Sequence, residues 1–374
     1  MRKPDTRACA ILVLLSAVPW CRAEVPLDTL KLPPGFHVAV YADQVPDARE
    51  LALGPDGTVF AGSGRAGKVY ALIDADHDGR AETVRVVASG LQDPIGIAFH
   101  AGDLYVGAVS RIFVLRDIQH HLDARPKPEL VTDRLPDETR HGGRFIAFGP
   151  DGRLYVPVGA PCNICDPGKD YARLLSMRAD GSDWRDVALG IRNTVGFDWQ
   201  PGTKQLWFTD NGRDLLGDDL PSDELNRVTR AGEHFGYPYC HQGDTPDPEF
   251  GNGKSCRDYT PPVAELGAHV ASLGMRFYTG SMFPDAYRGA VIVAEHGSWN
   301  RSRKSGYRVV AVKVDGARVT GQDVLVDGFQ HDERARGRPV DVLVMPDGAL
   351  LVSDDLAGAV YRISWSKPVS PTRG

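Results

Sequence analysis

Residues 141–156 read His-Gly-Gly-Arg-Phe-Ile-Ala-Phe-Gly-Pro-Asp-Gly-Arg-Leu-Tyr-Val, and this stretch decides the fold. A short apolar run over 145–149 leads into the turn Pro150-Asp151-Gly152, in which proline presets one φ and glycine supplies a positive φ. Residues 154–156 then form a second run that is rich in β-formers. The pattern predicts a β-hairpin with a lone imidazole, His141, just before its first strand.

The same hairpin unit recurs along the chain. Copies with the Pro-Asp-Gly turn lie at 51–60 and 342–352, looser copies lie at 97–106 and 197–208, and a degenerate sixth lies at 288–293. Units spaced by roughly 40–50 residues are typical of propeller blades. No segment carries a sustained helical period. We therefore expect an all-β, six-bladed β-propeller, with five or seven blades as the alternatives.

The composition sets further limits. A chain of 374 residues with 42% hydrophobic content can bury a substantial core, and a formal net charge of -6 argues against a nucleic-acid surface. Residues 1–23 resemble a secretory signal, with a basic start and an apolar run over 8–18. A lipoprotein signal at Cys21 is the rival, but Trp20 fits it badly. We expect 24–374 to be one propeller domain, periplasmic or secreted, with no transmembrane segment.

Four cysteines remain after the signal, and an even number in an exported protein suggests disulfides. We expect the local pairs Cys162–Cys165 and Cys240–Cys256. The Cys-Asn-Ile-Cys stretch at 162–165 could also be a redox, zinc or haem motif. Asp166 follows where a c-type haem site needs histidine, and a second such motif is absent. A structural bridge is therefore the preferred interpretation.

Polar residues stand directly before three of the inner apolar runs. They are His141, the pair Arg192 and Asn193, and Arg338. An imidazole can act as a general base near neutral pH, and arginine and amide side chains offer planar donors to an anionic or carbonyl-bearing ligand. Repetition at the same phase of the repeat predicts that they line one central channel, although exposed loop positions are the simpler alternative.

Two oxygen-rich stretches suit Ca²⁺, which takes carboxylate and backbone carbonyl ligands. One is 210–214, followed by Asp223 and Glu224, and a solvated acidic loop is its alternative. The other is 74–82, whose opening matches an EF-hand loop. Arg85 stands where that motif needs a bidentate glutamate, so a peripheral Ca²⁺ site and an Asp-rich turn both stay open.

The segment 295–301 follows the strand of the fifth unit. His296 and Arg301 could reach the channel from it, and Trp299 could cover a flat ligand or a sugar. A packed loop is the alternative interpretation. Phosphate-binding loops, serine-hydrolase elbows and zinc-protease motifs are absent from the sequence.

As a set, these motifs resemble the quinoprotein sugar dehydrogenases of the soluble glucose and aldose sugar dehydrogenase type, and most of all the sorbosone dehydrogenase branch. The resemblance runs from Leu32 to Ile363. Its most specific pieces are His141-Gly142-Gly143-Arg144, Arg192-Asn193 with Gly196, Asp223-Glu224-Leu225-Asn226, Phe235-Gly236-Tyr237-Pro238, Phe277-Tyr278-Thr279-Gly280 with Phe283-Pro284, and Arg338 with Asp341-Val342.

The resemblance implies a propeller that holds pyrroloquinoline quinone (PQQ) over Ca²⁺. His141 would remove the hydroxyl proton of a sugar substrate while hydride passes to the quinone, and Arg192 would polarise the accepting carbonyl. Electrons would pass on to a cytochrome c or a quinone acceptor. The other expected contacts are Gln92, Asn193, Arg301 and Arg338 for the cofactor, the carbonyls of Gly212 and Arg213 for Ca²⁺, and Asp210, Asp214 and Glu224 around the metal.

The chain also departs from that family's pattern. Val195 replaces a common glutamine, Val340 replaces a common arginine, and Arg213 replaces the usual proline. A clear lysine is missing at the fifth blade, where Arg301 could substitute. Two other hypotheses therefore stay open: a Ca²⁺-dependent lactonase-like hydrolase, and a non-catalytic propeller that binds glycans or a protein.

Overall fold

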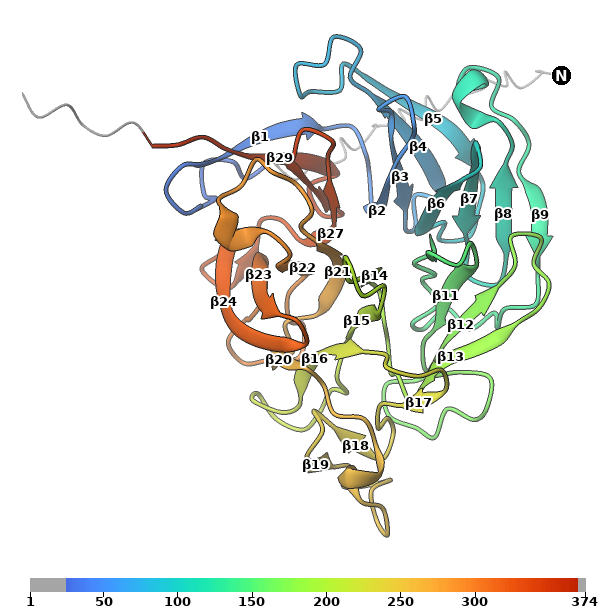
Figure 1. The fold of residues 1–374 in the computed structure, drawn as a ribbon, viewed down its shortest axis with the longest axis vertical. Coiled ribbons are helices and arrows are strands. Elements are labelled where there is room, and N and C mark those ends of the chain that lie inside the picture. The colour runs from blue at the N-terminus through green and yellow to red at the C-terminus, as the bar shows by residue number, and fades with distance from the viewer. Residues whose placement is uncertain (1–24, 369–374) are drawn as a thin grey trace, which may run out of the picture.

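The computed structural model describes residues 25–368, and in that range the chain forms 29 β-strands and three 3-10 turns, without any α-helix. Six sheets stand around a common axis as the blades of a propeller (Figure 1). The predicted all-β, six-bladed propeller is confirmed. The predicted signal at 1–23 lies outside the described residues. Within 25–368, none of the helices has the length and apolar character needed to cross a membrane.

Each blade is an antiparallel sheet whose first strand lies closest to the axis. Blades 1 to 3 comprise β2 (Ala48–Leu53), β3 (Val59–Ser63), β4 (Lys68–Ile73) and β5 (Thr83–Ser89); β6 (Gly96–His100), β7 (Asp103–Gly107), β8 (Ile112–Leu115) and β9 (Glu129–Thr132); and β10 (Ala147–Phe148), β11 (Leu154–Val158), β12 (Arg173–Met177) and β13 (Arg185–Leu189).

Blades 4 to 6 follow the same plan. They comprise β14 (Phe197–Trp199), β15 (Leu206–Asp210), β16 (Ser222–Arg227) and β20 (Ala264–Ala268); β21 (Ser272–Phe277), β22 (Val291–Glu295), β23 (Arg308–Asp315) and β24 (Arg318–Val326); and β27 (Pro339–Val344), β28 (Leu350–Asp354), β29 (Ala359–Trp365) and β1 (Phe36–Ala42). The short turns are η1 (Ile118–His120), η2 (Cys256–Asp258) and η3 (Asp285–Tyr287).

The repeated hairpin supplies the first two strands of each blade. In blade 3, Ala147 pairs with Tyr155 and Phe148 with Leu154 across the turn, and Gly152 has a φ of 74°. That positive φ explains the glycine, because other residues adopt it only at a cost. The degenerate sixth copy contributes β22, and η3 lies in the connection that precedes it.

The ring closes with the N-terminal strand. β1 pairs with β29 as the outermost strand of blade 6, so the two ends of the propeller meet in one sheet. Phe36 of β1 packs edge-on against Phe283 and Tyr287 of the blade 5 connection, with ring centroids 4.8 and 5.3 Å apart. Tyr41 faces the core that blade 6 shares with blade 1. β1 therefore joins three blades.

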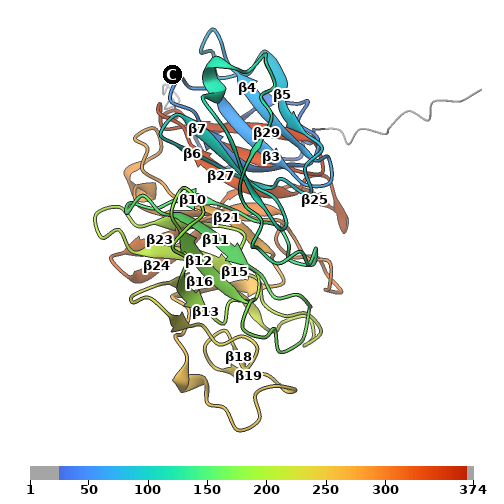
Figure 2. The same cartoon turned by 90° about the vertical axis from the view of Figure 1, so that its right-hand side faces the viewer.

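An insertion interrupts blade 4 between β16 and β20. It contributes β17 (Glu233–His234), which pairs in parallel with β13 of blade 3, and the hairpin of β18 (Cys240–His241) and β19 (Thr245–Pro246), which projects from the ring (Figures 1 and 2). Another small hairpin, β25 (Gln330–His331) with β26 (Arg334–Ala335), precedes β27. Both expected disulfides, Cys162–Cys165 and Cys240–Cys256, are present.

The placement of Asp223 and Glu224 in an acidic loop is wrong. Both belong to β16, where Glu224 lies opposite Asp210 of β15, and both side chains are buried. The charged sequence hides a strand whose carboxylates hydrogen-bond to backbone and amide groups within the fold. The insertion in blade 4 therefore begins after β16.

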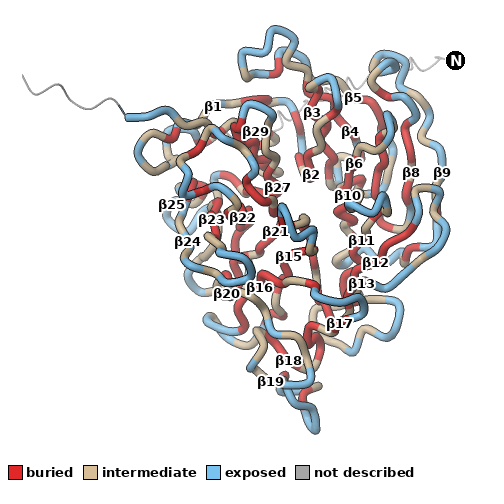
Figure 3. The backbone as a smooth tube through the Cα atoms, viewed as in Figure 1, coloured by how far each residue is buried: buried red, intermediate tan, exposed pale blue. Residues whose placement is uncertain are grey.

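Apolar clusters fill the spaces between neighbouring blades, and Figure 3 shows the buried backbone along the strands with exposed loops outside. The axis itself holds charge. Arg276 of β21 lies 3.4 Å from a carboxylate oxygen of Asp341 and 3.9 Å from one of Glu50. Glu50 accepts hydrogen bonds of 3.0 Å from the amides of both Ile97 and Ile146. Side chains therefore connect the inner strands of blades 1, 2, 3, 5 and 6.

Candidate functional site

The first two strands of each blade are antiparallel, so the start of the first strand lies beside the end of the second. Residues before the first strand and residues after the second therefore lie at the same end of the ring. His141, Arg192, Asn193 and Arg338 precede the first strands of blades 3, 4 and 6, and Gln92 precedes that of blade 2. The fold therefore brings the predicted entry residues to one face of the propeller. The segments 159–165 and 211–214 meet them there, each following a second strand.

His141 is held by one hydrogen bond. Its Nδ1 lies 2.8 Å from the carbonyl oxygen of Ala160, which can only accept, so Nδ1 carries the proton and Nε2 is left as an acceptor. Burial, followed by the positive charges of Arg192 and Arg140, lowers the pKa of His141 to about 3. The imidazole is therefore neutral at physiological pH, in the tautomer that a general base needs.

Arg192 is buried beside this histidine, and its guanidinium hydrogen-bonds to three residues. Nη1 donates to the carbonyl of Asn211 at 3.1 Å, and Nε donates to the carbonyl of Asn163 at 3.1 Å. Nη2 reaches the Oδ1 of Asn163 at 2.5 Å and the carboxylate of Asp214 at 3.4 Å. Burial lowers the pKa of Arg192, and the charge of Asp214 opposes that shift.

Asn193 borders the same space as His141. A Cβ atom added to Gly159 would lie 2.6 Å from the Cβ of His141 and 3.2 Å from the Oδ1 of Asn193, so both side chains close on this glycine. The carboxylate of Asp210 fixes the chain here, because it accepts from the amides of Arg192 at 2.8 Å and Asn193 at 2.6 Å. Gly159 and Asp210 are therefore structural parts of the site.

Arg338 belongs to a second charged cluster, centred on Asp355. That carboxylate accepts from Arg338 at 2.9 Å, from Arg49 at 2.9 Å and from His296 at 3.1 Å. Burial opposes ionisation of Asp355, but His296 and the two arginines outweigh it and lower its pKa. Two guanidinium groups thus share one carboxylate, which leaves a net positive charge at this edge of the site.

Two other expected cofactor contacts are placed differently. Gln92 is exposed, and its carbonyl accepts from the amide of Val109 at 3.2 Å. The guanidinium of Arg301 is engaged by the loop after β15, where it donates to the carbonyl of Asp218 at 2.9 Å and to the carboxylate of Asp219 at 2.7 Å. Arg301 therefore fastens two loops together at the rim of the site.

The residues expected around Ca²⁺ fall into two sets, one on the connection after β15 and one on the paired strands β15 and β16. Gly212 and Arg213 lie on the connection after β15, and the Arg213 side chain is committed to a buried ion pair with Asp247 at 2.5 Å. Asp214 pairs with Arg192. Asp210 and Glu224 lie side by side on β15 and β16, where burial raises the pKa of both carboxyls and the charge of Asp210 further raises that of Glu224.

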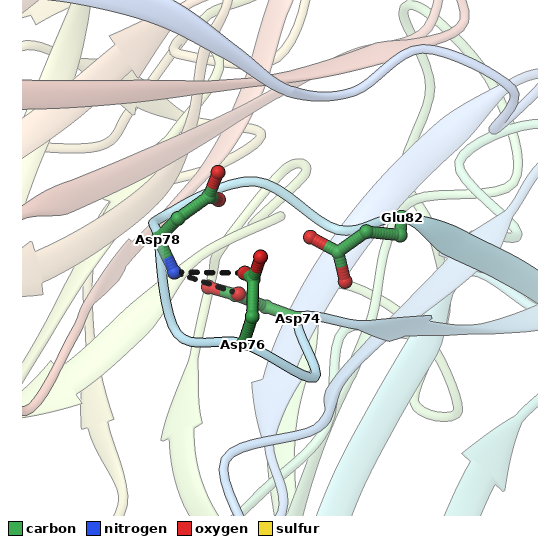
Figure 4. A group of neighbouring side chains, drawn as sticks. All are labelled: Asp74, Asp76, Asp78 and Glu82. Atoms are coloured by element: carbon green, nitrogen blue, oxygen red, sulfur yellow. Dashed lines mark hydrogen bonds between the residues drawn. The ribbon is translucent and has the colours of Figure 1, made fainter.

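The second acidic stretch forms a compact turn between β4 and β5, far from His141 in sequence (Figure 4). Ligand atoms of Asp74, Asp76, Asp78 and Glu82 all lie within 4.8 Å of one another. Backbone amides already bind all four of these carboxylates. Glu82 accepts from Ala75 at 2.9 Å, Asp74 and Asp76 accept from Asp78 at 3.1 and 3.2 Å, and Asp78 accepts from Arg80 at 2.8 Å. An Asp-rich turn and a peripheral Ca²⁺ site remain equally compatible with this geometry.

Several residues of the site escaped the sequence analysis. They are Asn163, Arg49 and Asp355, together with Glu50, Asp198 and Arg276 at the axis. Glu50, Asp198 and Arg276 are charged residues that interrupt the apolar first strands of their blades. A charged residue in such a strand is the sequence signal that could have revealed them. The two departures Val195 and Val340 pack with Leu273 into a small buried apolar cluster. The site therefore has apolar neighbours where polar ones were expected.

Comparisons with known proteins agree on the fold. A family model described as TrAA12-like matches residues 30–366. A Borreliella burgdorferi protein, named only as uncharacterized, is 33% identical over an alignment of 371 residues that covers 95% of this chain and 96% of that one. The calcium structure of Trichoderma reesei Carbohydrate-Active Enzymes Family AA12 superposes with a TM-score of 0.79 at 18% identity, covering 92% and 98% of the two chains. The holo PQQ domain of Coprinopsis cinerea pyranose dehydrogenase superposes with 0.75 at 20% identity, covering 90% and 97%.

Proposed function

The chain belongs to the TrAA12-like family, and from that premise we propose that it is a PQQ-dependent oxidoreductase. The proposed substrate is a sugar aldehyde or an aldose, of the sorbosone or aldose type. One observation carries the proposal beyond family membership: the Nε2 of His141 is left as an acceptor in a half-buried, neutral imidazole beside Arg192. We further propose that 24–374 forms a single catalytic domain in the periplasm or outside the cell.

The donors at this end of the ring suit an anionic, carbonyl-bearing quinone. Arg338 and Arg49 supply positive charge, Asn193 supplies an amide, and the Oγ1 of Thr194 is buried without a hydrogen-bond partner in the described chain. When bound, PQQ would accept hydride from the substrate. In the proposed roles, His141 takes the hydroxyl proton at Nε2 and Arg192 polarises the carbonyl that receives hydride. Arg338 and Asn193 hold the cofactor, with Gln92 and Arg301 as outer contacts.

Calcium is part of the proposal. The backbone carbonyls of Gly212 and Arg213 are the proposed ligands, because oxygen donors of this type suit Ca²⁺. Asp210, Asp214 and Glu224 would surround them. The contacts of Asp210 with backbone amides, and of Glu224 with the amides of Gln242 and Asn226, support a role in shaping this connection. Electrons would leave to a cytochrome c or a quinone acceptor.

A lactonase-like hydrolase is less well supported. Such an enzyme needs carboxylates around a channel cation to polarise an ester carbonyl. Carboxylates do meet at the axis, but Arg276 takes the place of the cation among Glu50, Asp198 and Asp341, all of which lie in its field. A non-catalytic binding propeller would not need a neutral His141 beside the buried Arg192.

Reconstitution tests the proposal. The mature chain is purified without metal, PQQ is added with and without Ca²⁺, and dye reduction is followed with pyranoses, other aldoses and sorbosone. We expect Ca²⁺-dependent dye reduction that falls by about 10²–10⁴-fold in His141→Ala while PQQ stays bound. Undiminished turnover in His141→Ala would refute the assigned base. A chain that binds no PQQ but hydrolyses lactones, or binds a glycan, would refute the dehydrogenase.

A further inference from the structure

A small disulfide loop reaches into the site from blade 3. Cys162 and Cys165 close a four-residue loop just after β11, at the same end of the ring as His141. Asn163, between the two cysteines, touches Arg192 twice, through its backbone carbonyl at 3.1 Å and its Oδ1 at 2.5 Å. The same Oδ1 accepts from the amide of Asp214 at 3.3 Å. One residue of the loop therefore contacts both partners of the Arg192–Asp214 ion pair.

The loop is itself anchored on its far side. The hydroxyl of Tyr237, a buried residue of the insertion, donates to the carbonyl of Cys165 at 3.1 Å and lies 3.8 Å from the Sγ of Cys162. The disulfide and this hydrogen bond limit where Asn163 can go. Apart from the loop, the guanidinium of Arg192 keeps the carbonyl of Asn211 at 3.1 Å and a longer contact to Asp214 at 3.4 Å.

We propose that the disulfide-closed loop 162–165 is a positioning device for Arg192, and that Asn163 is its positioning residue. The loop holds the guanidinium toward His141 and away from full pairing with Asp214. A bidentate contact of this kind fixes both the place and the plane of a guanidinium. The inference rests on the proposed function in one respect, the role of Arg192 toward the quinone. The hold on Arg192 itself does not depend on the cofactor.

The pKa of His141 depends on the position of the Arg192 guanidinium, and it can be measured without any cofactor. The charged groups that act on this imidazole are Arg192 and Arg140, and the charge of Arg192 helps to keep its pKa low. If Asn163 no longer holds the guanidinium, Arg192 can close on the Asp214 carboxylate and its field at His141 weakens. The pKa of His141 should then rise, by about one unit.

The experiment compares Asn163→Ala and the double variant Cys162→Ser/Cys165→Ser with wild type. NMR titration of the His141 imidazole, identified by its loss in His141→Gln, is carried out on the protein free of metal and quinone. PQQ affinity is measured separately by fluorescence. We expect the His141 pKa to rise in both variants, more in the double variant, and PQQ affinity to fall about tenfold. Asn163→Asp keeps the oxygen acceptor and should restore affinity.

The matched control is Cys240→Ser/Cys256→Ser, which removes the other disulfide. Within residues 25–368, neither of its cysteines hydrogen-bonds to the Arg192 guanidinium. This control should leave the His141 pKa unchanged. An unchanged His141 pKa in folded Asn163→Ala overturns the positioning role, even if the double variant fails to fold. If wild type binds no PQQ, the proposed function fails, while the titration still decides whether the loop holds Arg192.

Discussion

At the scale of single residues, the site depends on groups whose protonation the fold decides. His141 looks like an ordinary loop histidine in the sequence. Its environment makes it a half-buried neutral base, through the Ala160 carbonyl on one nitrogen and the Arg192 charge nearby. Gly159 matters because it has no side chain: a Cβ at this position would meet the Cβ of His141 and the Oδ1 of Asn193. Neither property follows from residue type alone.

The low pKa of His141 predicts a pH dependence of stability. The folded pKa of about 3 lies below the ordinary value of 6.5, so the unfolded chain binds more protons between these limits. Wild type should therefore lose stability relative to His141→Gln as the pH falls below about 6.5, by about 2 kcal/mol at pH 5. Urea unfolding of both proteins at pH 7.5 and pH 5 measures this. A difference in free energy of unfolding that stays constant with pH would contradict it.

At the scale of elements, the repeated Pro-Asp-Gly hairpin made the blades predictable, since its turn residues fix the local backbone. The entry residues were predictable because they share a phase with the repeat. Glu224 was misplaced because its strand, β16, is acidic rather than alternating, and hydrogen bonds that form only in the fold stabilise it there. Asn163 was overlooked because its importance comes from a contact with Arg192, 29 positions further along the chain.

The closing strand β1 gives a prediction at this scale. Phe36 is buried against rings of the blade 5 connection, whereas its neighbour His37 is exposed. Phe36→Ala should lower the free energy of unfolding by about 3 kcal/mol, since a cavity opens where β1 joins blades 5 and 6. His37→Ala, on the same strand, should change it by less than about 0.5 kcal/mol. Chemical denaturation compares them, and equal effects would mean that β1 does not secure the ring through Phe36.

At the scale of the whole molecule, carboxylates on inner strands bind the backbone of neighbouring blades. Asp341 of blade 6 accepts from the amide of Leu51 in blade 1 at 2.9 Å, and Asp198 of blade 4 accepts from Phe277 in blade 5 at 2.9 Å. Together with Glu50, these groups surround Arg276, which supplies the nearby cation. The ring that carries the site is therefore held at its axis by one arginine among three acids.

Removing that arginine should loosen the entire propeller. Arg276→Ala leaves the buried carboxylates of Glu50 and Asp341 and the half-buried one of Asp198 without their cation and should cost about 3–5 kcal/mol. Burial already raises the pKa values of Glu50, Asp198 and Asp341, so the folded protein binds more protons than the unfolded chain and stability falls as the pH rises. Without Arg276 these pKa values rise further. The loss should therefore be larger at pH 8 than at pH 5, as urea unfolding can measure.

Arg116→Ala is the matched control for this prediction. Arg116 also faces two carboxylates, those of Asp103 at 2.6 Å and Glu129 at 3.1 Å, but its side chain is 53% exposed. Water screens such a pair, so the control should cost only about 0–1 kcal/mol, with little change between the two pH values. If Arg276→Ala behaved like Arg116→Ala, the axial charges would not hold the blades together. The stability of the ring would then have to come from the apolar contacts between blades alone.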